Sequence, residues 1–192
     1  EVEKGDKRLG RILDLVKQRE DEGFAYDGAQ ASFELLARRE LGLLPRFFEV
    51  ERYRVTIERR HNALNREITV SEAVVVVNID DERVMSVSES FDPVSEADQG
   101  PVNALSRALA KDLGRFQGYI DDMHLIDFKV RITSGGTEAV TRVLIESADG
   151  QGRRWFTVGV SANIVDASFQ ALHDAVVWKL IRDGAAAKPA AA

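Results

Sequence analysis

The chain has 192 residues, of which 44% are hydrophobic and 30% are charged, and its formal net charge is -6. This composition is that of a folded globular protein, and the acidic balance argues against nucleic-acid binding, which needs a basic face. The lack of cysteine excludes disulfides, thiol catalysis and cysteine-ligated metals, and it leads us to expect a cytoplasmic protein.

The two ends of the sequence suggest a domain taken from a longer protein. The first residue is Glu1 rather than Met, so we expect further chain before it. Residues 185–192 are rich in alanine, have nothing to bury and are expected to be disordered. No apolar run reaches the roughly 18 residues of a membrane helix, and no signal-peptide pattern is present, so we expect no membrane partner.

Residues 1–45 are expected to form a helical linker subdomain. A second helical pattern runs from a turn at 26–28 to Pro45, and we interpret its apolar residues Phe33 and Leu36 as a docking face for the neighbouring domain. The first helix is predicted from apolar residues at helical spacing: Leu9, Ile12, Leu13 and Val16.

Beyond the linker the periodicity changes from helical to alternating. Residues 53–57 alternate between apolar and polar, which predicts a half-buried strand. The β-branched segment 68–79 predicts a well-buried strand, and Asp80-Asp81 turns it into a third strand over 83–91. A helix then starts at Pro101 with a predicted apolar stripe: Val102, Leu105, Leu109 and Leu113.

The same order of patterns then repeats. Residues 126–132 alternate strictly, 137–147 form the next predicted strand, and the hairpin signal at 149–152 leads into a third strand over 154–160. The final helix is predicted from about 163 to 183, with an apolar stripe on one side: Val165, Phe169, Leu172, Val176 and Leu180.

We therefore expect an α+β fold of two tandem βββα units with pseudo-twofold symmetry, preceded by the helical linker. The duplicated domain spans residues 46–184, and its units cover about 46–115 and 119–184. Three antiparallel strands expose an apolar face that one helix covers only in part, so the two units are expected to share a core.

Residue types that carry chemistry are sparse. No metal-ligand spacing, nucleophile elbow, Walker loop or dinucleotide motif occurs, and the three histidines lie far apart: His61, His124 and His173. The aspartate pairs at 80–81 and 121–122 fall in turns, where aspartate bonds to the local backbone. We therefore expect no catalytic residue, metal or cofactor in this chain, and a free-standing enzyme is the weakest interpretation.

The distinctive feature is the pair of junctions between a strand and a helix. Each places glycine and small polar residues before a helix N-terminus, whose free N–H groups favour an anion such as a carboxylate. A nearby acid could hold an ammonium group, so a free amino acid is a candidate ligand; from the residues alone, ordinary helix capping is favoured. The candidate residues are Asp98, Gly100, Pro101, Val102, Asn103, Ala104, Asp127, Gly159, Val160, Ser161, Asn163 and Ile164.

Several segments resemble, in order and spacing, the C-terminal regulatory domain of the 2-isopropylmalate and citramalate synthases. The segment at 26–36 is similar to the helical connection between the catalytic and regulatory parts in the citramalate branch. The resemblance covers about residues 8–182. The segments that carry it are 26–36, 100–105, 125–131, 137–147 and 159–172.

The resemblance implies a regulatory domain that forms a homodimer and binds a branched-chain amino acid, isoleucine or leucine, for feedback inhibition. It also implies a parent enzyme that condenses acetyl-CoA with a 2-oxo acid on a catalytic barrel that holds a divalent metal. That barrel would be a partner of this domain. Because no barrel sequence is present here, this chain is expected to have no synthase activity.

One segment departs from the family pattern. Family members usually have Gly-Asn-Gly or Gly-Asp-Gly before Pro-Val-Asn, whereas this chain has Asp98-Gln99-Gly100. A side chain stands where the backbone is bare in the family, which would narrow the pocket, change the preferred amino acid or abolish binding. The alternative function is therefore a dimerisation-only module that has lost effector binding.

Overall fold

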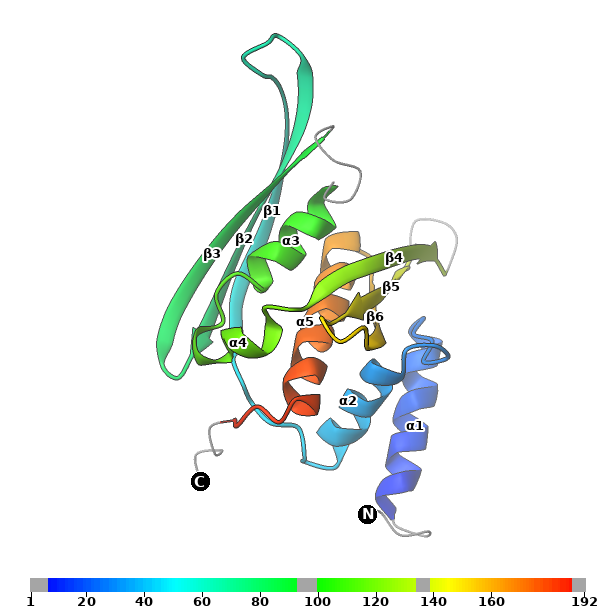
Figure 1. Cartoon of the computed structure of the whole chain (residues 1–192). Helices are drawn as coiled ribbons and strands as arrows, with labels where there is room; N and C mark the ends of the chain where they lie inside the picture. Colours follow the sequence, from blue (N-terminus) through cyan, green and yellow to red (C-terminus); the bar gives the residue numbers. More distant parts are fainter. Residues whose placement is uncertain (1–6, 93–99, 134–138, 188–192) are drawn as a thin grey trace. The chain divides into compact units, whose positions relative to one another are not determined.

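A computed structural model describes residues 7–92, 100–133 and 139–187 (Figure 1). Two three-stranded antiparallel sheets are each followed by a helix, which confirms the α+β fold of two βββα units. The candidate residue Asp98 lies outside the described residues. In chain order the elements are α1 (Lys7–Asp21), α2 (Gln30–Glu40), β1 (Glu49–His61), β2 (Glu67–Ile79), β3 (Glu82–Asp92), α3 (Gly100–Leu109), η1 (Gly114–Phe116), α4 (Gln117–Ile120), β4 (His124–Ile132), β5 (Thr141–Ala148), β6 (Arg154–Ser161) and α5 (Ile164–Arg182).

The chain packs as two compact units. One unit contains α1, α2, β4, β5, β6 and α5, and the other contains β1, β2, β3, α3, η1 and α4. The first two helices thus pack with the strands and the helix of the second βββα repeat. The boundaries predicted for the linker at residue 45 and for the two repeats stay predictions.

In the sheet β1-β2-β3, alternate residues of β2 form the core. Ala73, Val75 and Val77 are buried and point to one face, against which α3 packs. The β-branched run therefore predicted this strand correctly. Asp80 and Asp81 form the turn to β3 with positive φ angles of 51° and 71°, the conformation that a two-residue hairpin turn requires.

Leu113 marks a difference between the predicted and the observed helix. The pattern placed it on the stripe of the helix that starts at Pro101, but α3 ends at Leu109. The side chain of Gln117 explains this end, because its oxygen accepts the N–H of Leu113 (2.9 Å) and its amide donates to the carbonyl of Ala110 (3.0 Å). Leu113 is nevertheless fully buried, so the pattern identified a core residue but not its conformation.

In the sheet β4-β5-β6, α5 packs against β5 and β6. Polar side chains of β6 hold the helix directly: Trp155 donates to the carbonyl of Ala175 (3.2 Å), and the hydroxyl of Thr157 donates to the carbonyl of Ala171 (2.7 Å). Both donors are buried, so these bonds form away from water and fix the position of the helix on the sheet.

The alternating face of β4 is more exposed than its pattern predicts. Strict alternation is typical of a strand with one buried face, yet α5 packs on β5 and β6, and β4 is the edge strand beyond them. Phe128 and Val130 are 42% and 40% exposed, and Ile132 is 73% exposed. An apolar row on β4 is therefore left open to a partner.

Ser32 and Glu34 fasten α2 to its neighbours. The hydroxyl of Ser32 accepts the backbone N–H of Val158 on β6 (3.0 Å) and donates to Asp174 on α5 (2.8 Å). Glu34 accepts the indole N–H of Trp178 (2.9 Å). Because β6 is an edge strand, this bond also gives an acceptor to the backbone N–H of Val158, which no neighbouring strand can pair with.

The predicted docking face of α2 is divided. Leu36 is buried, whereas Phe33 is 43% exposed and its ring meets that of Tyr26 edge-on, with 6.0 Å between the ring centroids. Burial raises the pKa of the Tyr26 hydroxyl to about 12. This aromatic contact joins α2 to the turn that precedes it.

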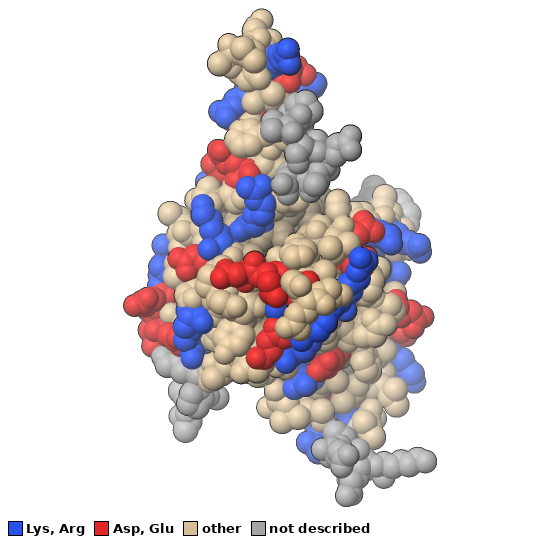
Figure 2. Space-filling view, in the orientation of Figure 1, with Lys and Arg blue, Asp and Glu red and all other residues tan. Residues whose placement is uncertain are grey.

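Charges of both signs are interspersed on the surface. Lys and Arg side chains lie among Asp and Glu over the face drawn in Figure 2. Some of them pair across strands: Arg154 lies 2.7 Å from Glu146, and Arg83 lies 2.6 Å from Glu51. Arg83, Glu51 and Arg154 are open to solvent, which screens these charges, so the pairs contribute little to stability.

Candidate functional site

The first candidate junction is the start of α3. Gly100 has a positive φ of 87°, and no described atom lies within 4 Å of the position that a side chain there would take. Val102 and Ala104 are buried in the core, and Pro101 occupies the first turn, where its missing N–H costs nothing. Asn103 lies three residues after Gly100 and so on the same side of the helix. Among the described residues of this junction, Gly100, Pro101 and Asn103 are therefore the ones with surface that a ligand could reach.

The second candidate junction, between β6 and α5, is capped by its own side chains. Asn163 accepts the N–H of Val165 (2.8 Å), and the hydroxyl of Ser161 accepts the N–H of Asn163 (3.1 Å). Asn163 is thus the N-cap of α5, in the manner that the capping interpretation predicts. Ile164, the first residue of the helix, is exposed.

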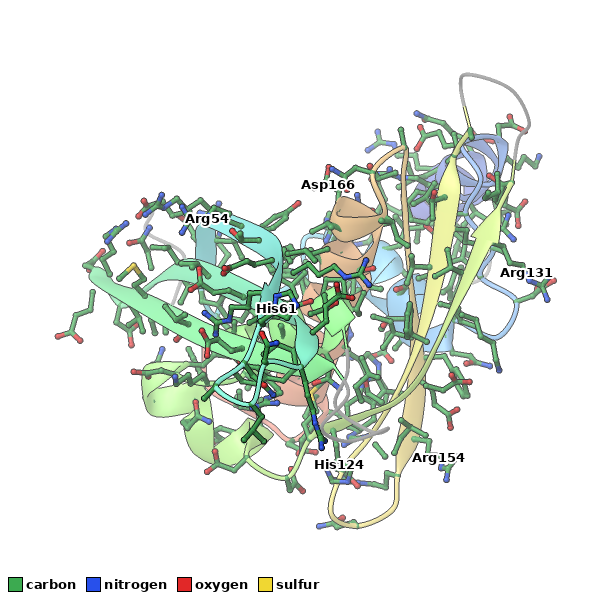
Figure 3. All side chains as sticks on the ribbon, turned by 90° about the horizontal axis from the view of Figure 1, so that it is seen from above. Arg54, His61, His124, Arg131, Arg154 and Asp166 are labelled. Carbon is green, nitrogen blue, oxygen red and sulfur yellow. The ribbon has the colours of Figure 1, made fainter. Side chains whose placement is uncertain are left out.

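The two helix N-termini differ in charge. Asp166 lies in the first turn of α5 (Figure 3), where its carboxylate already interacts with the positive end of the helix dipole and repels a second anion. The first turn of α3, which the structure describes completely, has no acidic residue. Of the two junctions, the start of α3 is therefore electrostatically the better place for a carboxylate.

Gly159 has a packing role. A Cβ atom at this position would lie 1.9 Å from the carbonyl oxygen of Ala167, a distance that no real structure allows. The glycine therefore permits α5 to approach β6 closely. Its neighbour Val160 is half-buried and donates its backbone N–H to Gln170 (3.2 Å). The predicted contact of Gly159 and Val160 with an effector stays a prediction.

Asp127 lies far from the second junction within its unit. It stands on β4 at a register shift, and its carboxylate pairs with Lys129 (3.3 Å). The strand pairing places Asp127 opposite Glu146 and level with Phe156 on β6, whereas the N-terminus of α5 follows the last residue of that strand, Ser161. Two strand spacings and the remaining residues of β6 separate them by about 20 Å. Within one chain, Asp127 and the N-terminus of α5 are therefore too far apart to hold one small ligand together, and the predicted role of Asp127 stays a prediction.

The sequence from residue 27 to residue 180 matches the family described as the LeuA allosteric (dimerisation) domain. This stretch includes both junctions and all six strands. The chain belongs to this family. The duplicated βββα architecture therefore lies almost wholly within the matched residues.

The LeuA domain described here is similar to part of several longer enzymes. The (R)-citramalate synthase of Aquifex aeolicus is 40% identical over 185 residues, which cover 95% of this chain and 33% of that protein. Those of Geobacter sulfurreducens and Streptomyces coelicolor are 43% and 41% identical, and the matches cover 88% and 95% of this chain but 30% and 32% of those proteins. The chain therefore spans about a third of the length of these relatives.

A charged cluster that the sequence pattern did not predict lies at the end of α5. The buried carboxylate of Asp149 accepts hydrogen bonds from the guanidinium groups of Arg153 (2.7 Å) and Arg182 (2.6 Å). The Arg182 guanidinium also lies 4.7 Å from the ring centroids of both Trp155 and Trp178. Desolvation alone would raise the pKa of Asp149, but the hydrogen bonds from Arg153 and the backbone outweigh it and lower the pKa to about 2. The cluster ties the hairpin before β6 to the last turn of α5. The sequence pattern did not reveal this cluster because Asp149 and Arg182 are 33 residues apart in the chain.

The described residues of this LeuA domain form neither a metal-binding cluster nor a membrane-spanning helix. Among the described residues, no group of three or more histidine, aspartate and glutamate side chains is placed to hold a metal ion. None of the described helices is both long and apolar enough to cross a membrane.

Proposed function

We propose that this chain is the regulatory and dimerisation domain of an (R)-citramalate synthase, and that it binds isoleucine or leucine for feedback inhibition. The observation that carries the proposal is the match of nearly the whole chain, at about 40% identity, to one third of such enzymes. The condensation of acetyl-CoA with a 2-oxo acid, and the divalent metal that this reaction needs, would belong to the catalytic barrel of the parent protein. A cytoplasmic location is part of the same proposal.

The start of α3 supports the effector part of the proposal. The amino-acid carboxylate would lie at the N-terminus of this helix, whose first turn carries no competing acid. No described atom occupies the side-chain position of Gly100, and the amide of Asn103, on the same side of the helix, can donate or accept a hydrogen bond. Asp98 is the proposed partner of the ammonium group.

Ser32 supports a route from the regulatory sheet to the linker helices. Its hydroxyl contacts both β6, through Val158, and α5, through Asp174. A shift of α5 against β6 would therefore alter a hydrogen bond of α2. An effector that favours one arrangement of these elements would change the affinity of the parent enzyme for its ligands. Those ligands would change the affinity for the effector by the same coupling free energy.

The two junction asparagines make a matched test. We expect isothermal titration calorimetry to show binding of isoleucine or leucine, and Asn103→Ala to weaken it about tenfold, which is about 1.4 kcal/mol. Asn163→Ala should leave the affinity unchanged and lower the unfolding free energy by about 1 kcal/mol, since it removes a helix cap. The reverse result would move the effector to the start of α5.

The same titration separates the proposal from its alternative. A dimerisation-only module would sediment as a dimer but show no heat and no rise in melting temperature with isoleucine, leucine or valine. That result would remove the effector from the proposal and leave the family membership intact. Turnover of acetyl-CoA and pyruvate by this chain alone would contradict the assignment of the chemistry to the parent's barrel.

A further inference from the structure

A hollow of about 290 Å³ lies on the face of β4 and β5 that points away from α5. Its strand residues pair directly across the two strands, Lys129 with Leu144 and Arg131 with Arg142. Val143, the neighbour of Arg142 on β5, is fully buried and belongs to the opposite face, on which α5 packs. The residues that line the hollow are Ala25, Asp27, Lys129, Arg131, Arg142 and Leu144.

The hollow concentrates positive charge on an acidic chain. Arg131 and Arg142 stand directly opposite each other, an arrangement of like charges that destabilises a sheet unless an anion compensates for it. Lys129, two residues from Arg131, shares its face and is paired with Asp127 (3.3 Å). Among the described residues that line the hollow, Asp27 is the one acid.

The two guanidinium groups are not neutralised by carboxylates of the described residues. Arg142 donates its Nε–H to the carbonyl oxygen of Gly23, which carries no charge. Arg131 has no ion-pair partner in the part of the chain that the structure describes, and its side chain points outward from β4 (Figure 3). Guanidinium groups bind carboxylates with two parallel hydrogen bonds, so each of them can take one carboxylate.

The volume of the hollow and its apolar lining residues restrict the class of ligand further. Its volume is at the lower limit of small-molecule sites, too small for a nucleotide and sufficient for a short aliphatic acid. Leu144 and Ala25 provide apolar surface between the charged groups. A ligand with two carboxylates and a short apolar body therefore matches both the charges and the space.

We propose that this hollow is a second small-molecule site, separate from the helix junctions, and that it takes a small aliphatic dicarboxylate such as succinate or 2-methylmalate. The ligand would neutralise Arg131 and Arg142. It would also tie the turn between α1 and α2 to the sheet, because Ala25 and Asp27 belong to this turn and Arg142 already holds Gly23. The site does not depend on the proposed function, since it uses none of the junction residues.

The test is a titration of the chain at low ionic strength with succinate and 2-methylmalate, with acetate and inorganic phosphate for comparison. We expect the dicarboxylates to bind at least tenfold more tightly than acetate or phosphate. Arg131→Gln should weaken their binding about tenfold. Asp27→Asn should tighten it several-fold, because it removes the one negative charge from the lining.

Arg54→Gln is the matched control. Arg54 is also an exposed arginine on a strand, and it lines a hollow on the other sheet together with Arg52. Its replacement should leave dicarboxylate binding unchanged, and circular dichroism should show all three variants folded. The proposal would be overturned by absence of dicarboxylate binding, by equal binding of phosphate, by an equal loss in Arg54→Gln, or by binding of a glutamate-rich peptide alone, which would assign the face to a protein partner.

Discussion

At the scale of single residues, Gly159 decides how closely α5 approaches its sheet. We expect Gly159→Ala to lower the unfolding free energy by about 3 kcal/mol, the upper part of the range for overpacked cores, because the new methyl group meets the Ala167 carbonyl at 1.9 Å. Urea unfolding measures this loss. Gly10→Ala in α1 is the control: the space there is open among the described atoms, so the exchange should stabilise by about 0.5–1 kcal/mol. Equal effects of the two changes would show that helix packing does not depend on Gly159.

Asp149 makes the stability of its unit depend on acidity. Its pKa is lowered from 3.8 to about 2 in the folded chain, so the unfolded chain takes up the proton first as the pH falls. The stabilisation is complete above about pH 5 and is lost as the pH falls from about 4 through 2. Unfolding free energies measured from pH 6 to pH 2 should fall less steeply for Asp149→Asn than for the natural chain. Parallel curves would exclude this contribution.

At the scale of helices and strands, periodicity predicted the existence and order of the elements. The β-branched run of β2 and the Asp80-Asp81 turn carry local information, so their structure followed from the sequence. The end of α3 did not follow from the local sequence, because the side chain of Gln117, which lies beyond the helix, bonds to the carbonyl of Ala110 and ends the helix there. Alternation in β4 predicted one apolar face but could not reveal that the helix lies over the other two strands.

The hydroxyl of Ser32 is one of the attachments of α2 to the neighbouring strand and helix. Ser32→Ala would leave the N–H of Val158 and the carboxylate of Asp174 without this partner. Because Ser32 is buried, we expect a loss of about 1–3 kcal/mol in unfolding free energy. Ser147→Ala is the matched control, since the buried hydroxyl of Ser147 has no hydrogen-bond partner among the described residues, and its removal should be neutral or stabilising. If Ser32→Ala were as harmless as Ser147→Ala, the bridge would carry no stability.

At the scale of the whole molecule, the candidate junctions were predictable and the charged hollow was not. Glycine, serine and asparagine before a helix are local signals, and the capping by Asn163 followed from them. The pairing of Arg131 with Arg142 depends on register, which is set by the shift between Leu125 and Asp127. A shift by one residue would turn these side chains to the other face, and no sequence pattern marks it.

The exposed apolar row on β4 is a candidate surface for assembly of two chains. A domain that dimerises must bury apolar surface, and Phe128, Val130 and Ile132 offer a contiguous row of it. We expect the natural chain to sediment as a dimer and Val130→Glu to raise the dissociation constant at least tenfold, because a charge would be buried without a partner. Leu43→Glu, at a position that is equally apolar and 59% exposed, should leave the dimer intact. A dimer that survives Val130→Glu, or one that Leu43→Glu dissociates, would place the interface elsewhere.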